Sequence, residues 1–502
     1  MEAERTPVVA AWAEVCVRGA ERPPVLSLVA KASEEALATA AVRPSEVDRV
    51  SVLGILAGGG PRPASDLAER LGLRARRCET TTIGGNGPQW LVTRAAAEIA
   101  AGRLRSTLIA GGEALAGAGA GASGGQDGQP SASTGGDPDP LVGDPRPGVG
   151  PAEIAIGLGL PLHVYAILES AYAARLGRRP AAHRAALGEL LAPFSEVAAR
   201  HPYAWSRTPL TAREIALPGP DNRLVCEQYT KRMCANPRVN QAAALLVCSL
   251  AEARRLGLAE QAVFVWAGAD ATDVWEPSAR PELWRSPGIE LAAGATLNAA
   301  GVQLEEVAYR DLYSCFPVAV ELALDALAAL SDGRGVDAVP PTVTGGLPFF
   351  GGPGNNYSTH AIATVCRLLS GAEGRQLALV GALGWYLTKH SYGLYGSSPP
   401  PGGFVRADTS VEQRRIDASA LPVVREPEPL AERARVEGWT VVRAPDGTAE
   451  HAPVIARLND GRRVVCEATD EQLSAFASDE VDLTGATLEV RGWPPRYRLV
   501  RA

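Results

Sequence analysis

The sequence contains very little lysine: only Lys31, Lys231 and Lys389 are found among its 49 basic residues. Its formal net charge is −7, whereas a general nucleic-acid-binding protein usually has a basic face. The chain also has no uninterrupted apolar run of about 20 residues, the length that a membrane-spanning helix requires. These absences argue against a nucleic-acid partner and against a membrane protein.

Paired cysteines and a leader segment are missing as well. None of the eight cysteines belongs to a Cys-x-x-Cys pair, so we expect no structural zinc site and no other metal centre. Residues 1–5 are acidic and lack the apolar core of a signal peptide. We therefore expect a cytoplasmic protein whose cysteines are free thiols.

A pattern of segments occurs twice along the chain. Residues 41–56 and 301–316 each follow an Ala-rich helical stretch, and each predicts a short loop followed by a strand. Residues 84–87 and 351–354 are Gly-rich, and each precedes a helix-like run and another strand. The two pairs are separated by nearly equal lengths of chain, which favours a duplication over the alternative of two unrelated strand–helix units.

Strands that alternate with helices predict parallel sheets covered by helices. Two such halves in matched order predict a pseudo-twofold α/β/α/β/α sandwich. In open α/β folds, ligands bind beyond the carboxyl ends of the strands, where loops meet helix N-termini. Both Gly-rich loops are expected there, which makes them the first candidates for a functional site.

The remaining segments differ from the repeat in composition. Residues from about 116 to 150 are rich in Gly, Ala, Ser, Pro and Asp, which predicts a flexible surface loop. Amphipathic helices are expected over 163–176 and 181–199. Short β signals between 439 and 500, with a hairpin turn at 459–461, predict a small β-rich domain, which we expect to be a partly open barrel of OB type.

These segments predict a division of the chain into five parts. The parts are residues 1–115 with 236–270 for the first half of the repeat, 116–235 for the loop and a helical lobe, 271–400 for the second half, 401–437 for a linker, and 438–502 for the β-rich domain. From residue 421 onward there are 11 Arg against 14 acidic residues. A single-strand binder needs a basic groove with stacking aromatics, so this tail is not expected to bind nucleic acid.

Residues 5–400 resemble thiolases, in particular the sterol-carrier-protein-type branch, and the tail looks like the additional C-terminal domain of thiolase-like proteins of type 1. The resemblance implies an α/β thiolase fold and a homologue of acetyl-CoA acetyltransferases. Thiolases place a nucleophilic Cys at a helix N-terminus in the loop Cys-Gly-Ser-Gly-x-Gln. Residues 84–89 of this chain are Gly-Gly-Asn-Gly-Pro-Gln, so Gly84 occupies the nucleophile position. Glycine cannot be acylated, and Cys78 could replace the thiolate only if the loop were rebuilt.

The other catalytic loops depart from the thiolase pattern too. Gly352 occupies the place of the His in the Gly-His-Pro loop, and residues 313–316 are Tyr-Ser-Cys-Phe in place of an Asn-Glu-Ala-Phe or His-Asp-Cys-Phe loop. No Cys lies between Cys366 and Cys466, where the second catalytic Cys is expected. The resemblance therefore predicts a thiolase fold without ordinary thiolase chemistry.

The resemblance also implies CoA or acyl-CoA as a ligand. Residues 222–223 and 229–231 match the stretch that leads back from the CoA-binding lobe, which makes Arg223 and Lys231 candidate contacts for the CoA phosphates. The alternative is that both are solvated surface charges. Gly351 and Gly354 of the second Gly-rich loop are further candidate binding positions.

A different chemistry could replace the lost one. His390, Tyr313 and Tyr357 are our catalytic candidates, and Tyr386 and Lys389 are expected in the same cleft, which His360 could also approach. A Tyr or His there could deprotonate a β-hydroxyacyl-CoA and start retro-aldol cleavage. Some sterol-carrier-type relatives are aldolases that act with a small OB-fold partner, a part that the tail could play. Structural hydrogen bonding for His390 and simple packing for the tyrosines are the alternatives.

Three functions follow from this sequence. The leading hypothesis is a CoA-binding or acyl-CoA-binding protein of thiolase fold that performs neither thiolysis nor Claisen condensation. The second is a retro-aldol C–C lyase, and the third is a non-catalytic assembly partner. A homodimer, or a protein partner held through the C-terminal domain, is compatible with each of them.

Overall fold

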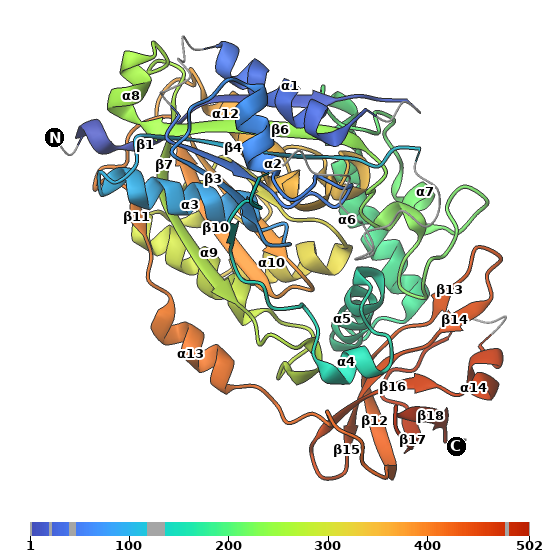
Figure 1. Ribbon diagram of the computed structural model, residues 1–502. Helices are drawn as coiled ribbons and strands as arrows, with labels where there is room; N and C mark the ends of the chain where they lie inside the picture. Colours follow the sequence, from blue (N-terminus) through green and yellow to red (C-terminus); the bar gives the residue numbers. More distant parts are fainter. Residues whose placement is uncertain (1–2, 20–22, 40–46, 118–135, 477–480, 501–502) are drawn as a thin grey trace.

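The computed structural model describes residues 3–19, 23–39, 47–117, 136–476 and 481–500. Its largest element is an 11-stranded mixed sheet (Figure 1). Along the sheet, the strands follow one another in the order β5 (Leu141–Val142), β3 (Arg77–Thr81), β2 (Arg49–Val52), β4 (Ser106–Ala114), β6 (Asn240–Ser249), β1 (Pro7–Cys16), β7 (Val263–Thr272), β10 (Lys389–Gly396), β9 (Leu377–Gly384) and β8 (Tyr309–Leu312). The remaining strand, β11 (Val405–Arg406), pairs with β7.

The predicted duplication is confirmed by the strand pairing. In the first half, β2 pairs parallel with β4, β4 antiparallel with β6, and β6 antiparallel with β1. In the second half, β8 pairs parallel with β9, β9 antiparallel with β10, and β10 antiparallel with β7. The halves join where β1 meets β7, through the pairs Val8↔Phe264 and Val9↔Val263. The same order and the same strand directions therefore occur twice.

The expectation of purely parallel sheets is wrong at the centre. β6, β1, β7 and β10 form an antiparallel block, whereas the outer strands pair parallel and the short β11 pairs parallel with β7. A tight connection permits this arrangement, because antiparallel strands can be joined by a short hairpin whereas parallel strands need a crossover. Such a hairpin links β9 to β10 at Trp385–Thr388, where Trp385 and Leu387 have φ of 54° and 55°.

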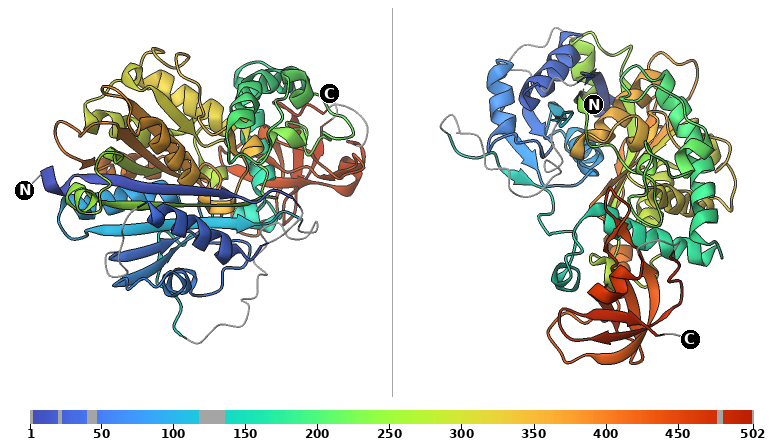
Figure 2. Two further views of the ribbon diagram at one scale, coloured as in Figure 1. Left: turned by 90° about the horizontal axis from the view of Figure 1, so that it is seen from above. Right: turned by 90° about the vertical axis from the view of Figure 1, so that its right-hand side faces the viewer.

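The helices form layers on the sheet (Figures 1 and 2). Around the two halves they are α1 (Val25–Ala38), α2 (Pro63–Arg70), α3 (Gly87–Ala100), α8 (Leu250–Arg255), α9 (Pro287–Ala300), α10 (Pro317–Leu330), α11 (Gly346–Phe349) and α12 (Tyr357–Leu369). Buried side chains of α3 and α12, such as Val92 and Val365, share one core with Val9, Val263 and Val380 of the sheet. These two helices are therefore the inner layer of the sandwich.

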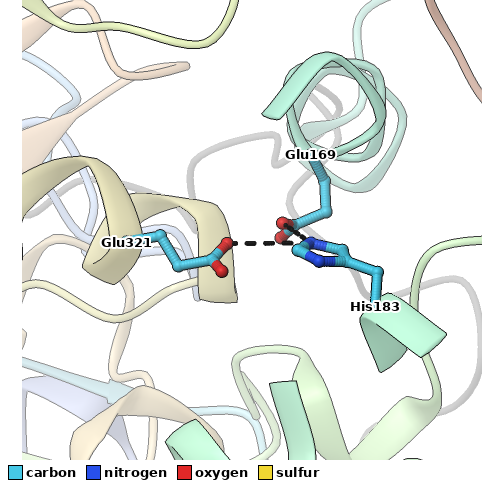
Figure 3. Close-up of side chains that lie close together, drawn as sticks. All are labelled: Glu169, His183 and Glu321. Carbon is cyan, nitrogen blue, oxygen red and sulfur yellow. Dashed lines mark hydrogen bonds and ion pairs between the residues drawn. The ribbon is translucent and has the colours of Figure 1, made fainter. Parts of the chain in front are cut away.

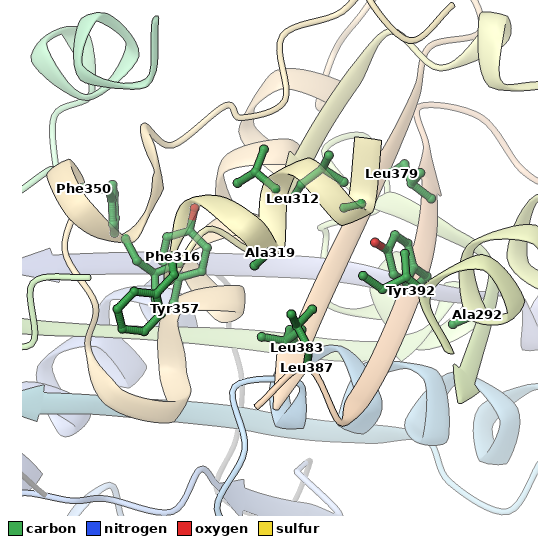
Figure 4. Close-up of a cluster of buried hydrophobic side chains, with 14 of the residues drawn as sticks. Ala292, Leu312, Phe316, Ala319, Phe350, Tyr357, Leu379, Leu383, Leu387 and Tyr392 are labelled. Carbon is green, nitrogen blue, oxygen red and sulfur yellow. The ribbon is translucent and has the colours of Figure 1, made fainter. Parts of the chain in front are cut away.

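A second, larger core lies under the outer helices. It includes Leu28 of α1, Ala292 of α9 and Ala319 of α10, together with sheet residues such as Leu108, Leu312 and Leu379. Figure 4 shows part of this core around α10, where Tyr357 and Phe350 lie close to Phe316. The aromatic rings here connect the second half of the repeat to the helical lobe, since Tyr165 stacks on Phe316 with 4.7 Å between ring centroids.

A helical lobe lies between the two halves in sequence. Its helices are α4 (Pro151–Ala155), α5 (Pro161–Arg175), α6 (Pro180–Arg200) and α7 (Ala212–Ala216). The expected helices over 163–176 and 181–199 are thus present. The segment predicted as a flexible loop, 116–150, falls partly outside the described residues. Within 136–150 it pairs β5 with β3, and the Asp139 carboxylate accepts a hydrogen bond from Ala64 N at 2.7 Å.

The C-terminal domain is a closed five-stranded barrel with its own core. Around the barrel the strands are β12 (Ala431–Trp439), β15 (Val454–Leu458), β16 (Arg463–Ala468), β18 (Arg496–Leu499) and β17 (Thr487–Arg491). The third and fifth strands, β16 and β18, pair parallel, and α14 (Asp470–Ser474) connects the third to the fourth. This is the strand order of an OB fold, although the barrel is closed where we expected it to be partly open.

The barrel lies at one end of the molecule, beside α4 and α5 (Figure 1). A short ribbon of β13 (Val442–Arg443) and β14 (Ala449–His451) adjoins it, and α13 (Ser410–Ala418) precedes it along the chain. Arg443 and Glu227 form a buried ion pair of 2.7 Å between this ribbon and the helical lobe. Among the described residues, no helix is both long and apolar enough to cross a membrane.

Candidate functional site

A cavity of about 1020 Å³ opens where several strands end near the N-terminus of α3. Its walls come from the end of β3, the start of α3, the 143–146 loop, the end of β7, the start of β10 and the 406–417 segment. The lining residues used below are Asn86, Asp144, Arg146, Asp270, Lys389 and Arg406. The first Gly-rich loop therefore borders a cavity, as its place after a strand and before a helix predicted.

The register of β10 decides which side chains face this cavity. Lys389 pairs with Thr272, and Ser391 pairs with Asp270. Successive residues of a strand point to opposite faces of its sheet. Lys389 and Ser391 therefore share the face that looks toward Asn86 at the start of α3, whereas His390 points toward α9.

Lys389 lies directly against the first Gly-rich loop. Its Nζ donates a hydrogen bond to the carbonyl of Ile83 at 2.6 Å. A Cβ placed on Gly84 would lie 2.8 Å from this Nζ, and 2.6 Å from the Oδ1 of Asn86. The lysine thus fills the space that a side chain at position 84 would need.

The environment of Lys389 disfavours its charged form. The residue is 6% exposed, and no described carboxylate forms an ion pair with it. Burial, together with the nearby charge of Arg146, lowers the pKa of Lys389 to about 8, although Asp144 acts in the opposite direction. A substantial fraction of this side chain is therefore a neutral amine at slightly alkaline pH.

The second half of the repeat holds the first Gly-rich loop in place. The amide of Gly84 donates to the Oδ1 of Asn355 at 2.8 Å. The amide group of Asn355 in turn donates to the carbonyl of Gly54 at 2.7 Å. Gly84 has a φ of 152°, a backbone conformation that favours glycine.

A chain of hydrogen bonds lines the cavity next to Lys389. Asn86 donates to the hydroxyl of Ser391 at 3.3 Å, and that hydroxyl donates to Asp270 at 2.7 Å. Arg406 binds the other carboxylate oxygen of Asp270 at 3.0 Å. Burial nevertheless raises the pKa of Asp270. An acid with an elevated pKa and an amine with a lowered pKa therefore line the same cavity, as at many catalytic sites.

His390 of β10, our first catalytic candidate, contacts residues at the start of α9. Its Nε2 lies 3.0 Å from the Oδ2 of Asp273 and 3.4 Å from the hydroxyl of Ser286. Both partners cap α9, because Asp273 accepts from Gly288 N and Ser286 accepts from Ile289 N. Burial would raise the pKa of Asp273, but its hydrogen bond and charge interaction with His390 lower it overall. The ring is 1% exposed and is committed to this capping cluster.

Tyr313 and Tyr357 lie together, with their rings in edge contact and their centroids 5.5 Å apart. The hydroxyl of Tyr313 lies against Gly85, in the space that a Cβ there would occupy. Tyr357 donates to Asp311 at 2.8 Å and contacts the hydroxyl of Thr344 at 2.6 Å. Burial raises the pKa of both phenols. Neither ring is among the residues that line the cavity.

The other two cleft candidates have partners elsewhere. Tyr386 donates to the carbonyl of Gly159. His360 is buried and lies 3.0 Å from the Oε1 of Glu14, far along the sequence on β1. Of the side chains named from the sequence, the structure brings Lys389 and His390 to the borders of the cavity, and both Lys389 and Tyr313 direct their polar groups toward the first Gly-rich loop.

The candidate binding residues lie away from this cavity. Arg223 donates to the backbone carbonyls of Leu224 and Arg443 at 3.0 and 3.2 Å, and Lys231 is exposed. Gly351 and Gly354 have φ of 119° and 52°, so both use conformations that favour glycine. Gly352 differs, because a Cβ there would meet its nearest neighbour, the carbonyl oxygen of Asn236, only at 3.4 Å.

A triad that the sequence did not reveal lies on three helices: Glu169 on α5 and His183 on α6, which are buried, and Glu321 on α10, which is partly buried (Figure 3). One ligand atom from each lies within 4.8 Å of the others, the spacing of a possible cation site. His183 Nε2 contacts Glu169 at 2.6 Å, and Tyr229 donates to the second oxygen of Glu169 at 2.7 Å. Burial and the charge of Glu169 raise the pKa of Glu321 well above its usual value. This shift favours the protonated form of Glu321, which would lower the negative charge of the triad without a cation.

Comparison with known proteins identifies the class. The fold is similar to an acetyl-CoA acetyltransferase from Syntrophomonas wolfei, with a TM-score of 0.54, 14% identity, and coverage of 78% of this chain and 99% of that one. It is also similar to an Ltp2-ChsH2(DUF35) aldolase, with a TM-score of 0.59, 18% identity, and coverage of 78% and 98%. These similarities, together with the duplicated sheet, define a protein of the thiolase fold with an added OB-type barrel.

The similarity to a third structure is much greater. A monomeric SCP2-thiolase-like protein type 1 from Mycobacterium smegmatis matches with a TM-score of 0.82 and 30% identity, over 99% of both chains. The family model of the thiolase-like protein type 1 additional C-terminal domain matches residues 413–492. The chain belongs to the SCP2-thiolase-like protein type 1 family. No curated protein matches it by sequence.

Proposed function

We propose that this protein binds CoA or an acyl-CoA and performs neither thiolysis nor Claisen condensation. One observation carries the proposal: Gly84 has no side chain at the position where thiolases have their nucleophile, and Lys389 fills the adjoining space, with its Nζ 2.8 Å from where a Cβ would lie. Acyl transfer in thiolases needs a thiolate at that point. An amine hydrogen-bonded to the carbonyl of Ile83 cannot replace it as a reversible acyl carrier.

The cysteines of the chain support the same proposal. Cys78 is the nearest in sequence to the loop, and burial raises its pKa. Burial also raises the pKa of Cys315, to about 12. A reactive cysteine normally has a lowered pKa. Neither thiol therefore has the electrostatic environment of an acyl-accepting nucleophile.

The experiment combines calorimetry with an activity assay. We expect CoA to bind measurably and acetoacetyl-CoA to undergo no thiolysis above the rate without protein. Thiolysis that depends on this protein would contradict the proposal, and so would the absence of any heat of CoA binding at millimolar concentrations.

The contacts with CoA are a second part of the proposal. The resemblance assigns Arg223 and Lys231 to the CoA phosphates, and the amine of Lys231 is exposed and accessible. A charge-assisted hydrogen bond contributes about 1.5 kcal/mol or more, so Lys231→Ala should weaken CoA binding by about tenfold. Lys31→Ala is the matched control, because Lys31 is also an exposed lysine and lies on α1. Equal affinities of the two variants would remove Lys231 from the binding site.

A retro-aldol C–C lyase acting on a β-hydroxyacyl-CoA is the second candidate. The observation that favours it is the union of a thiolase-type body and an OB-type barrel in one chain, together with the fold similarity to an Ltp2-ChsH2(DUF35) aldolase. If it is correct, Tyr313→Phe should abolish cleavage while CoA affinity is unchanged. No turnover over a panel of β-hydroxyacyl-CoA esters would eliminate the lyase and favour a non-catalytic role in which the barrel holds a protein partner.

A further inference from the structure

We propose that Lys389 forms an imine with the ketone of a β-ketoacyl thioester bound in the cavity at the start of α3. The inference rests on the proposed function, because it takes an acyl-CoA as the ligand of that cavity. It adds a covalent role for one side chain and a chemical class for the substrate.

The geometry supplies the first argument. Lys389 lines the cavity, and its Nζ lies beside Gly84, where a substrate carbonyl would meet the sulfur atom in a thiolase. Here the same carbonyl would meet nitrogen. The Nζ donates one N–H to the carbonyl of Ile83 at 2.6 Å, and in the neutral amine this leaves a lone pair free for attack.

The surroundings of Lys389 favour the neutral amine over the ammonium ion. Lys389 is 6% exposed, and among the described residues it has no carboxylate ion-pair partner. Desolvation of this kind disfavours an ammonium ion and is a known route to nucleophilic lysines. The effect agrees with the lowered pKa of this side chain, about 8.

The chemistry of nitrogen selects the substrate. Attack on a thioester would release the thiol and leave an amide, which is too stable to turn over. Attack on a ketone is reversible, so the productive electrophile for Lys389 is a ketone. A β-ketoacyl thioester offers that ketone two bonds away from the thioester carbon.

The step balances without an added oxidant or reductant. The nitrogen lone pair attacks the ketone carbon, and the π electrons of the C=O bond move to oxygen, which takes up a proton. The nitrogen loses its protons as the C–O bond breaks, one water molecule leaves, and a C=N bond forms. Asp270 lines the same cavity and is connected to Asn86 through Ser391. Burial raises its pKa, and we assign to this carboxyl group the transfer of a proton from the nitrogen to the departing oxygen.

The scarcity of lysine makes the test direct. The full-length protein would be incubated with acetoacetyl-CoA and sodium cyanoborohydride at pH 8, and the modified lysines would be located by peptide mapping. Lys31 and Lys231 are exposed internal controls in every sample. An amine of ordinary lysine pKa, about 10.4, is less than 1% neutral at pH 8. We therefore expect at least about tenfold more label on Lys389 than on either control.

Two variants and a second probe complete the design. Lys389→Met should lose the dominant label, whereas Lys31→Arg should keep it. Equal label on the three lysines of the unmodified sequence, or none on Lys389, would overturn the imine, and this comparison needs no variant to fold. Acetoacetate separates the two proposals. Labelling of Lys389 by acetoacetate without CoA binding supports the imine and contradicts the proposed function. CoA binding without label from either probe contradicts the imine alone.

Discussion

Lys389 and Gly84, which are 305 positions apart in the chain, share one side-chain space: a Cβ on Gly84 would lie 2.8 Å from the Nζ and 2.9 Å from the Cε of Lys389. The contact joins the start of β10 to the loop before α3, so it connects the two halves of the repeat. It also explains why a side chain cannot simply be restored at position 84.

Gly84→Ala should therefore destabilise the protein. The methyl group collides with Lys389, and the φ of 152° adds backbone strain. Overpacking of this kind costs about 1–3 kcal/mol in the free energy of unfolding. In a Lys389→Ala background the collision with the lysine disappears and the close contact with Asn86 remains, so the cost should fall by at least about 0.5 kcal/mol. Urea unfolding of the four proteins measures this coupling.

Gly352→Ala is the control for that cycle. The nearest neighbour of its Cβ would lie at 3.4 Å, so the added methyl group meets ordinary contacts. We expect a change of less than about 1 kcal/mol. A loss as large as that of Gly84→Ala would show that the stability of both loops depends on glycine for another reason.

The titration of Lys389 predicts a pH dependence of stability. Its pKa is about 8 in the folded protein and 10.5 in the reference state, so between these values the unfolded chain binds more protons. Stability should therefore rise with pH across this window, by about 3 kcal/mol in total from this group. Buried tyrosines and cysteines with raised pKa act in the opposite direction, so the quantity to measure is the difference between the unmodified protein and Lys389→Met. A constant difference from pH 7.5 to 10 would mean that the amine is already charged in the fold.

The resemblance and the repeat identified the fold, but one unpredicted turn kept the sequence from showing which side chains face the cavity. The sequence predicts a strand ending near residue 381, and residues 381–390 contain no Asn-Gly or Asp-Gly turn signal. The hairpin instead uses Trp385 and Leu387 in left-handed conformations, which these residue types rarely adopt. Without the start of β10, the alternation that points Lys389 inward and His390 toward α9 could not be assigned.

The triad of Glu169, His183 and Glu321 could not be predicted from the sequence, for a different reason. Its members come from three helices, and Glu321 is far from the other two along the chain. No local spacing marks such a set, because only the packing of α5, α6 and α10 brings the side chains together. By contrast, the barrel was predictable from local alternation and turn residues, with Gly461 at a φ of 88° in the turn between β15 and β16.

Glu321→Gln tests the protonation of this triad. The pKa of Glu321 is raised by burial and by Glu169, so the folded state holds its proton after the unfolded chain has lost it. This group therefore makes stability fall as pH rises above the ordinary carboxyl range. The amide removes that penalty, and we expect Glu321→Gln to be neutral or more stable at pH 8, by up to about 1–2 kcal/mol. Thermal unfolding at pH 5 and pH 8 measures the change. Glu169→Gln is the control and should destabilise, because Glu169 accepts from His183 and Tyr229.

If the triad is instead a cation site, added zinc or manganese would change the effect of Glu321→Gln on stability. In that case Glu321→Gln would abolish binding of the added ion by calorimetry and would lower, not raise, the unfolding temperature in its presence. If added ion does not shift the unfolding temperature of the unmodified protein, the result would favour the proton on Glu321 over a bound cation.

A buried ion pair should contribute to the attachment of the barrel. Arg443 and Glu227 are 8% and 2% exposed in their side chains and lie 2.7 Å apart. Removing one member of such a pair leaves a buried charge and costs about 3–5 kcal/mol. Arg443→Met should therefore make the barrel an early site of proteolytic release, whereas the double variant Arg443→Met with Glu227→Gln should recover part of the protection. Identical cleavage of the single and double variants would show that the pair does not hold the barrel.

Mass spectrometry after incubation with acetyl-CoA tests the central claim most directly. With Gly84 in place of a thiol and Lys389 in the adjoining space, we predict that CoA binds and that none of the eight cysteines becomes acetylated. A thioester mapped to any cysteine, Cys78 above all, would contradict the account.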